Sequence, residues 1–260
     1  MLEAVLDIAV EAGRRILTVY ESDFAVSNKE DNSPLTQADL AAHEYISAEL
    51  SRQWPELPVL SEEAASIPFE TRSSWTRYWL VDPLDGTKEF IKRNGEFTVN
   101  IALIDDGKPV LAVVHGPVLK LTYLAEQGGG AWRIKDGVRE AIHTRRPPPA
   151  VPTLVVSKSH RDAATDAFLA KMPEHEALSR GSSLKLCLVA EGSADLYPRI
   201  GPTSEWDTAA GHCIAVQAGG EVLRLPDLQP LLYNQKESLL NPHFVVIGDP
   251  SFPWREKLQA

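Results

Sequence analysis

The amino-acid sequence predicts a protein of mixed α and β structure, with an α+β N-terminal half and an α/β C-terminal half. The chain opens with two segments that have a helical period. Short apolar runs of period two follow, separated by turn signals such as DDG and GGG, which indicates a largely antiparallel sheet. After a proline-rich break at residues 145–152, strand-like and helix-like segments alternate, which favours an α/β layer.

The N-terminal segment is predicted to be an amphipathic helix. Apolar residues recur there near the 3.6-residue period, with charged residues between them: Leu2, Val5, Leu6, Ala9, Ile16 and Val19. A second helix is expected over QADLAAHEYISAEL, because Pro34 keeps the entry extended and Thr36 is a suitable N-cap. The inward residues of this helix are predicted to be Leu40, Tyr45, Ile46 and Leu50.

The strands of the first half come next. They are predicted at RYWLV, FTVNIALI, KPVLAVVHG, LTYLAE and GAWRI. The three consecutive prolines at residues 147–149 fit neither a helix interior nor a central strand, so the segment is interpreted as a linker. This divides the chain into lobes at residues 1–146 and 150–260.

The second lobe is expected to alternate strands with helices. Its predicted strands are TLVVS, ADLYPRI, EVLRL and HFVVIG. Its predicted helices are RDAATDAFLAKM, SLKLCLVAEG and DTAAGHCIAVQAGG.

Composition and charge exclude several classes of function. A formal net charge of -10 argues against a nucleic-acid polymer or an anionic membrane surface as the main partner, although bound cations can still attract a small anionic substrate. No apolar run is long enough to span a membrane, and Glu3 and Asp7 interrupt any signal-peptide pattern. Cys187 and Cys213 have no metal-binding spacing and are expected to be reduced thiols of a cytoplasmic protein.

Four separate features place acidic residues beside small residues: Asp39 in LTQAD, Glu62 in LSEE, the pair in DPLDGT, and Asp207 in EWDTAAG. Three of them also have simple structural interpretations. Thr36 and Asp39 have the spacing of a capping box, Glu62 can be a loop charge, and Asp207 can be an N-cap or first-turn acid.

The pair Asp82 and Asp85 ends a buried strand, and Pro83 keeps the backbone extended before a sharp LDGT turn. Both carboxylates and the Leu84 carbonyl can then point to one side. Two like charges this close repel each other unless a cation lies between them, and Mg²⁺ prefers such oxygen ligands. The alternative is a simple acidic turn.

The segments WLVDPLDGTKEF and EWDTAAGHCIAVQAGG resemble the two signatures of the inositol monophosphatase-like phosphatases, a Mg²⁺-dependent and lithium-sensitive superfamily. SPLTQAD and LSEE occur upstream in the order that this superfamily shows. The resemblance implies the layered αβαβα sugar-phosphatase fold. KEF after the threonine, together with VSKSHRD and GSSLKLCLVAEGSADLYPR, resembles the bacterial 3′(2′),5′-bisphosphate nucleotidases. This branch hydrolyses adenosine 3′,5′-bisphosphate to AMP and phosphate in sulfur assimilation.

The resemblance also implies roles for individual residues. The implied ligands of two Mg²⁺ ions are Glu62, Asp82, the Leu84 carbonyl, Asp85 and Asp207. Asp82 would bridge the ions. Asp39 and Thr87, with Glu62, match the residues that orient and deprotonate the attacking water, around a third and looser ion. The Gly86 and Thr87 amides would hold the transferred phosphate.

Four further residues match positions that contact the nucleotide in related enzymes: His160, Ser182, Lys185 and Arg199. Lys185 and Arg199 are the expected partners of the phosphate that does not react. Alternatively, Lys185 extends from a helix to the surface, and His160 caps the following helix. The short segment before Asp207 makes Arg199 the least secure of these assignments, and Trp206 is interpreted as a packing residue.

Two other functions remain as alternatives at this point. One is a phosphatase of the same fold that acts on inositol phosphates or fructose 1,6-bisphosphate. The other is a non-catalytic, metal-dependent phosphate-binding protein. The expected assembly is a monomer or a homodimer, with peripheral contact to the inner face of a membrane as a further option.

Overall fold

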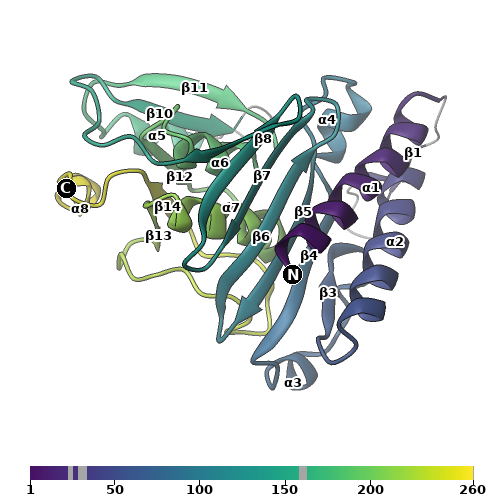
Figure 1. The fold of residues 1–260 in the computed structure, drawn as a ribbon. Coiled ribbons are helices and arrows are strands. Elements are labelled where there is room, and N and C mark those ends of the chain that lie inside the picture. The colour runs from purple at the N-terminus through teal and green to yellow at the C-terminus, as the bar shows by residue number, and fades with distance from the viewer. Residues whose placement is uncertain (23–25, 29–33, 158–162, 260) are drawn as a thin grey trace.

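The structure, a computed structural model, describes residues 1–22, 26–28, 34–157 and 163–259. Five layers follow one another in the order αβαβα (Figure 1). A seven-stranded sheet and a five-stranded sheet form the two β layers, and a short pair, β1 (Val26–Asn28) and β2 (Pro34–Thr36), lies apart from them. The predicted fold class is confirmed.

The seven-stranded sheet has its strands in sequence order, from β3 to β9. β3 and β4 are parallel and every other neighbouring pair is antiparallel, as the period-two runs predict. Its strands are β3 (Val59–Ser61), β4 (Arg77–Asp85), β5 (Thr98–Asp105), β6 (Lys108–Gly116), β7 (Leu121–Glu126), β8 (Gly130–Lys135) and β9 (Val138–Ile142).

The five-stranded sheet has the order β11, β10, β12, β14, β13 and mixes parallel with antiparallel pairs. Its strands are β10 (Thr153–Ser157), β11 (Glu176–Arg180), β12 (Leu196–Arg199), β13 (Glu221–Arg224) and β14 (Phe244–Ile247). The chain passes from one sheet to the other between Ile142 and Thr153, where the prolines lie. The division into lobes at residues 147–149 stays a prediction.

The helices cover the faces of both sheets. The long ones are α1 (Leu2–Tyr20), α2 (Gln37–Gln53) and α7 (Glu205–Gln217). The shorter ones are the 3₁₀ turn η1 (Glu62–Ala64), α3 (Phe69–Arg72), α4 (Thr87–Ile91), α5 (Ala163–Leu169), α6 (Leu184–Ala190) and α8 (Trp254–Gln259). α1 and α2 lie on one face of the large sheet, and α6 and α7 lie between the two sheets (Figure 1).

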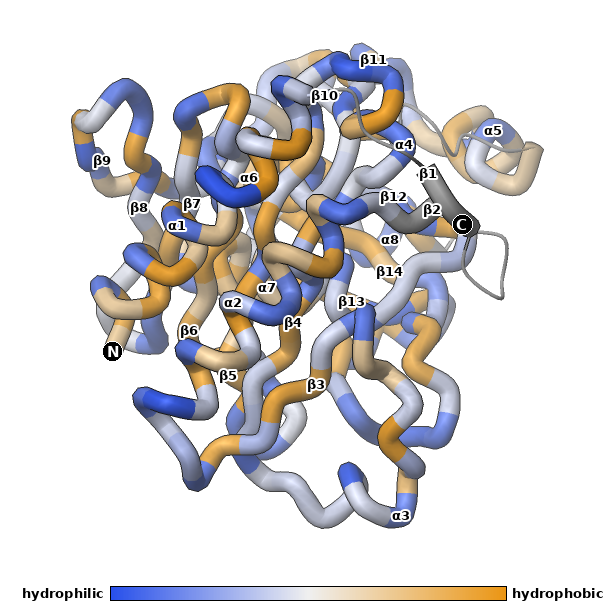
Figure 2. Tube along the Cα trace, turned by 90° about the vertical axis from the view of Figure 1, so that its right-hand side faces the viewer, coloured by the Kyte–Doolittle hydropathy of each residue, from blue (hydrophilic) through white to orange (hydrophobic). Residues whose placement is uncertain are grey.

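Strand β4 shows why both faces of the large sheet are covered. Its side chains alternate between faces, so Trp79 and Val81 pack with α1 and α2, whereas Tyr78 and Leu80 pack with α6 and α7. All four side chains are buried. The hydrophobic stretches follow the interior strands, and the most hydrophilic ones lie mainly in outer loops (Figure 2). Packing on both faces therefore holds β4 firmly where it carries Asp82 and Asp85 at its C-terminal end.

Most of the predicted helices and strands are confirmed, with several differences. Leu40 does not face inward, because its side chain is 43% exposed. The short strands β1, β2 and β3 and the short helices α3, α4 and α8 are not predicted by the sequence patterns, and neither are β9 and β11, which are mostly exposed. Across the described segments, no helix combines the length and the apolar character needed to cross a membrane.

Helices α6 and α7 touch closely at Gly211. A Cβ atom at this position would lie 2.7 Å from the Leu186 Cβ atom, far inside van der Waals contact. We expect Gly211→Ala to lower the free energy of unfolding by roughly 1–3 kcal/mol, because overpacking moves the two helices apart. Urea denaturation measures this loss.

Gly116→Ala is the matched control. The nearest atom to a Cβ at Gly116 lies 3.6 Å away, which is ordinary contact. Equal losses in the two variants would contradict the close packing of α6 against α7.

Candidate functional site

The two acidic residues at the end of β4 reach the same side of the sheet through a β-bulge. Residues three apart in a regular strand point to opposite faces. In β4, Asp82 pairs with Asn100 and Asp85 pairs with Thr98, so three steps on β4 match two steps on β5. The extra residue rotates Asp85 onto the side of Asp82. The Leu84 amide then donates to Asp82 Oδ1 at 3.1 Å, which fixes the turn.

A third carboxylate joins this pair from helix α7. Oxygen atoms of Asp82, Asp85 and Asp207 all lie within 4.8 Å of one another. Burial raises the pKa of Asp82 well above its usual range, and the charges of Glu62, Asp85 and Asp207 raise it further. Burial and then the charge of Asp85 raise the pKa of Asp207 to about 6. The cluster therefore favours a proton or a cation, and its all-oxygen donor set suits a hard divalent ion.

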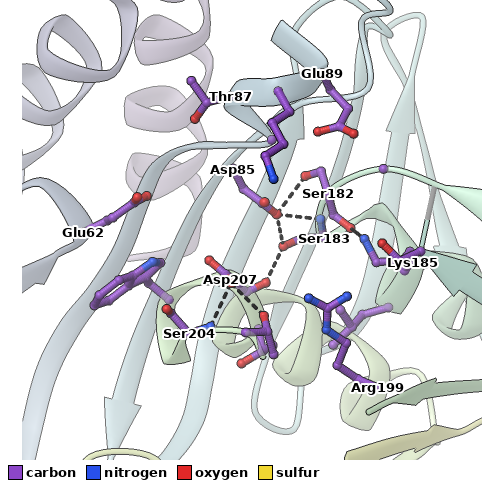
Figure 3. A pocket seen from close by; sticks show the side chains of 18 of the residues that line it. Glu62, Asp85, Thr87, Glu89, Ser182, Ser183, Lys185, Arg199, Ser204 and Asp207 are labelled. Carbon is purple, nitrogen blue, oxygen red and sulfur yellow. Dashed lines mark hydrogen bonds between the residues drawn. The ribbon is translucent and has the colours of Figure 1, made fainter. Parts of the chain in front are cut away.

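The Asp85 side chain is held by hydrogen bonds that all go to one of its two carboxylate oxygens. Its Oδ2 accepts from Ser182 Oγ at 2.8 Å, from the Ser183 amide at 2.6 Å and from Ser183 Oγ at 2.7 Å (Figure 3). It also lies 3.3 Å from the Asn100 side-chain amide. An oxygen that accepts this many hydrogen bonds has little remaining capacity, so Oδ1 is the atom available to a ligand.

Asp207 is held in the same way. Its Oδ2 accepts from Thr203 Oγ1 at 2.7 Å and from the Ser204 amide at 2.8 Å. Ser204 is the N-cap of α7, and Asp207 is the N3 residue of a capping box. The first-turn interpretation of Asp207 is thus confirmed and the N-cap interpretation is wrong. The capping box leaves Oδ1 free to serve as a ligand, so the structural and the functional interpretations are compatible.

Asp39, in the first turn of α2, is also held through one carboxylate oxygen by a capping box. The amide and the hydroxyl of Thr36 donate to Asp39 Oδ2 at 2.8 and 2.6 Å, which confirms the predicted capping box. The Thr87 hydroxyl donates to Asp39 Oδ1 at 3.3 Å. The fold therefore brings Asp39 and Thr87, 48 positions apart, within hydrogen-bond distance, and their role in activating water stays a prediction.

Glu62 and Gly86 line one cavity together with Asp85, Thr87 and Asp207. Glu62, at the start of η1, is close enough to Asp82 to raise its pKa through charge and through a hydrogen bond. Gly86 has φ 97°, a left-handed conformation that β-branched and bulky residues avoid, and this turn starts α4 at Thr87.

The cavity holds about 300 Å³. Figure 3 shows Glu62 and Thr87 on one side, Asp85 and Asp207 in the middle, and the cations Lys185 and Arg199 on the other side, where Glu89 also lies. Lys185 is buried and donates to the Ser182 carbonyl at 2.5 Å. Its interpretation as a surface-reaching lysine is wrong. Burial lowers the pKa of Lys185 to about 8, so the amine is mostly charged at neutral pH.

The structure thus brings together nearly all of the sequence-predicted residues. His160 lies outside the described residues, so its contact with a nucleotide stays a prediction. Trp206 is partly buried, packs against the central core and lines the cavity, in agreement with a packing role. Sequence reasoning missed Ser183, Thr203 and Asn100. A signal for Asn100 was present, since it is a lone amide within the apolar run FTVNIALI.

Comparison with known proteins identifies the family. The model of the inositol monophosphatase family matches residues 1–248, and this chain belongs to that family. The 3′(2′),5′-bisphosphate nucleotidase CysQ of Salmonella typhimurium is 54% identical over 250 residues, which cover 95% of this chain and 99% of the relative. The corresponding protein of Haemophilus influenzae is 39% identical over 264 residues, with 100% and 97% covered.

Solved structures agree with this assignment. CysQ from Bacteroides thetaiotaomicron, a bacterial member of the inositol monophosphatase family, has a TM-score of 0.83 and 45% identity, and the match covers 95% of this chain and 96% of that one. An inositol monophosphatase from Zymomonas mobilis has a TM-score of 0.80 at 24% identity, with 100% and 97% covered, which shows the shared fold.

The raised pKa values predict how divalent cations affect stability. Between about pH 4 and pH 6, Asp207 loses its proton more readily in the unfolded chain than in the metal-free folded protein, because its folded pKa is about 6. The metal-free protein therefore loses stability as the pH rises through this range, and Asp82 extends the loss upward. A cation binds the ionised carboxylates and competes with protons.

We expect Mg²⁺ at about ten times its dissociation constant to raise the Tm by about 4 °C at pH 8 and by clearly less at pH 5. Differential scanning fluorimetry measures both shifts. Asp82→Asn should abolish the shift at pH 8. An equal shift at both pH values would show that the ion binds elsewhere.

Proposed function

We propose that this chain is a Mg²⁺-dependent 3′(2′),5′-bisphosphate nucleotidase that hydrolyses adenosine 3′,5′-bisphosphate to AMP and phosphate. One observation carries the proposal: a single cavity has a carboxylate cluster on one side and the cations Lys185 and Arg199 on the other. A substrate with two phosphates fits this polarity, because one phosphate reacts at the cluster while the other pairs with the cations. The 54% identity to a CysQ nucleotidase supports the same choice.

The residues present fit Mg²⁺ as the cofactor. The five proposed ligands offer oxygen alone. Burial and the charges of Glu62, Asp85 and Asp207 raise the pKa of Asp82, a shift that a bound cation would oppose. We assign one ion to Glu62, Asp82 and the Leu84 carbonyl, and a second to Asp82, Asp85 and Asp207. When bound, Mg²⁺ offsets the charge of the phosphoryl oxygens and lowers the pKa of the attacking water.

Thr87 and Asp39 then move the proton. Thr87 Oγ1 can accept a proton from the water while it passes its own to Asp39 Oδ1, 3.3 Å away. Thr36 holds Asp39 Oδ2, so the receiving oxygen keeps its direction. The amides of Gly86 and Thr87 hold the transferred phosphoryl group. The water oxygen bonds to phosphorus as the bond between phosphorus and the ribose 3′-oxygen breaks. The ribose oxygen takes up a proton from solvent, Asp39 returns its proton to solvent, and AMP and phosphate leave.

Substrate choice tests the proposal directly. We expect Mg²⁺-dependent phosphate release to be fastest with adenosine 3′,5′-bisphosphate and much slower with inositol 1-phosphate or fructose 1,6-bisphosphate. Thr87→Ala should lower kcat at least about 100-fold, since it removes the proton relay, and Asp82→Asn should lower it as well. Thr87→Ser keeps the hydroxyl and should retain most activity. A preference for inositol 1-phosphate would contradict the assignment. Unchanged turnover in both Thr87→Ala and Asp82→Asn would contradict the assigned mechanism. Mg²⁺-dependent binding of the bisphosphate without any phosphate release would instead indicate a non-catalytic binding protein.

A second prediction concerns the phosphate that does not react. Lys185→Met removes the buried cation, so the KM for adenosine 3′,5′-bisphosphate should rise at least about tenfold. Adenosine 3′-monophosphate lacks that phosphate, and its KM should stay within about twofold. Steady-state phosphate release measures both constants, with the exposed Lys171→Met as control. A parallel loss with both substrates would rule out a contact with the second phosphate.

A further inference from the structure

Strand β5 carries two buried polar side chains directly behind Asp85. Thr98 and Asn100 are 0% and 1% exposed, and they lie in a strand whose other buried residues are apolar. Being two positions apart, they lie on the same face of β5. They also face the bulge of β4, because Thr98 pairs with Asp85 and Asn100 with Asp82. Burying two polar side chains is unfavourable unless each is hydrogen-bonded.

The hydrogen bonds of Asn100 fix the orientation of its amide. Its nitrogen lies 3.3 Å from Asp85 Oδ2 and 2.8 Å from Ser183 Oγ. Because a carboxylate oxygen can only accept, the group facing it must be the NH₂. The Asn100 oxygen then accepts from the Thr98 hydroxyl at 2.9 Å. Every polar atom of the Asn100 side chain is thereby satisfied by a partner of the correct kind.

Thr98 extends the network to the second residue that holds Asp85. Thr98 Oγ1 and Ser182 Oγ lie 2.5 Å apart, and Ser182 Oγ donates its single proton to Asp85 Oδ2. Ser182 Oγ is therefore the acceptor in its contact with Thr98, whose proton is shared between Asn100 Oδ1 and Ser182 Oγ. Ser182 has φ 53°, a conformation that costs free energy for a residue other than glycine. The contact with Thr98 helps to hold Ser182 in this conformation. β5 therefore supports both serines that direct Asp85.

We propose that Thr98 and Asn100 are positioning residues of the metal site, which hold Asp85 so that Oδ1 alone is left for the cation. This rests on the proposed function in that the cation is Mg²⁺. The two residues contact Asp85 and the serines that bind it. Groups that orient metal ligands typically contribute a factor of 10 to 100 in metal affinity.

Isothermal titration of the full-length protein with Mg²⁺ tests the proposal. Asn100→Leu has a similar shape but no donor, and we expect its Mg²⁺ dissociation constant to rise at least about tenfold. Thr98→Val should raise it several-fold, whereas Thr98→Ser, which keeps the hydroxyl, should stay within about twofold of wild type. Saturating Mg²⁺ should restore most of kcat in Thr98→Val, which a general loss of folding would not allow.

The outcomes separate this proposal from the proposed function. If both Asn100→Leu and Thr98→Val bind Mg²⁺ with wild-type affinity while their Tm falls, the two residues are structural and the proposal is overturned. If Asn100→Leu does not fold, the Mg²⁺ dissociation constants of Thr98→Val and Thr98→Ser are compared instead. Equal, wild-type constants in these two variants would overturn the proposal. Wild-type protein that binds Mg²⁺ but does not hydrolyse adenosine 3′,5′-bisphosphate would overturn the proposed function alone, because the titration needs no substrate.

Discussion

The mutual repulsion of carboxylates in a buried cleft is the constraint on which the site depends. Oxygen atoms of Asp82, Asp85 and Asp207 lie within 4.8 Å of one another, and burial together with the neighbouring charges raises the pKa values of Asp82 and Asp207. Left to themselves, such groups would turn apart or take up protons. The fold keeps Asp85 and Asp207 in place with hydrogen bonds to the Oδ2 atom of each side chain, which leaves the Oδ1 atoms for a cation. The stability that the sheets provide is thus used to hold an unfavourable arrangement.

The groups that hold the carboxylates come from separate layers. A bulge in β4 turns Asp85 toward Asp82, and the start of α6 supplies Ser182 and Ser183. The capping box of α7 holds Asp207. Residues far apart in sequence meet because the large sheet packs on α6 and α7. Helix capping and metal binding therefore use the two oxygens of one carboxylate and do not compete.

Local sequence predicts much of this molecule, and long-range contacts explain most of the remainder. The apolar runs of the large sheet and the cap at Thr36 are local signals, and both are confirmed. The mostly exposed strands β9 and β11 have no such signal, and pairing with neighbouring strands places them in their sheets. The acidic residues could be identified from their motifs. The lone amide of Asn100 in an apolar run is a local signal, but its partner is not, because the contact joins β5 to Ser183 at the N-cap of α6.

The most direct test of the central claim is a crystal structure with Mg²⁺ and the product AMP. The account predicts ions at the cluster bound through Oδ1 of Asp85 and Oδ1 of Asp207. The Oδ2 atoms should keep their hydrogen bonds to Ser182, Ser183, Thr203 and Ser204. Ions bound through the Oδ2 atoms, or an Asp207 turned out of the cluster, would contradict it.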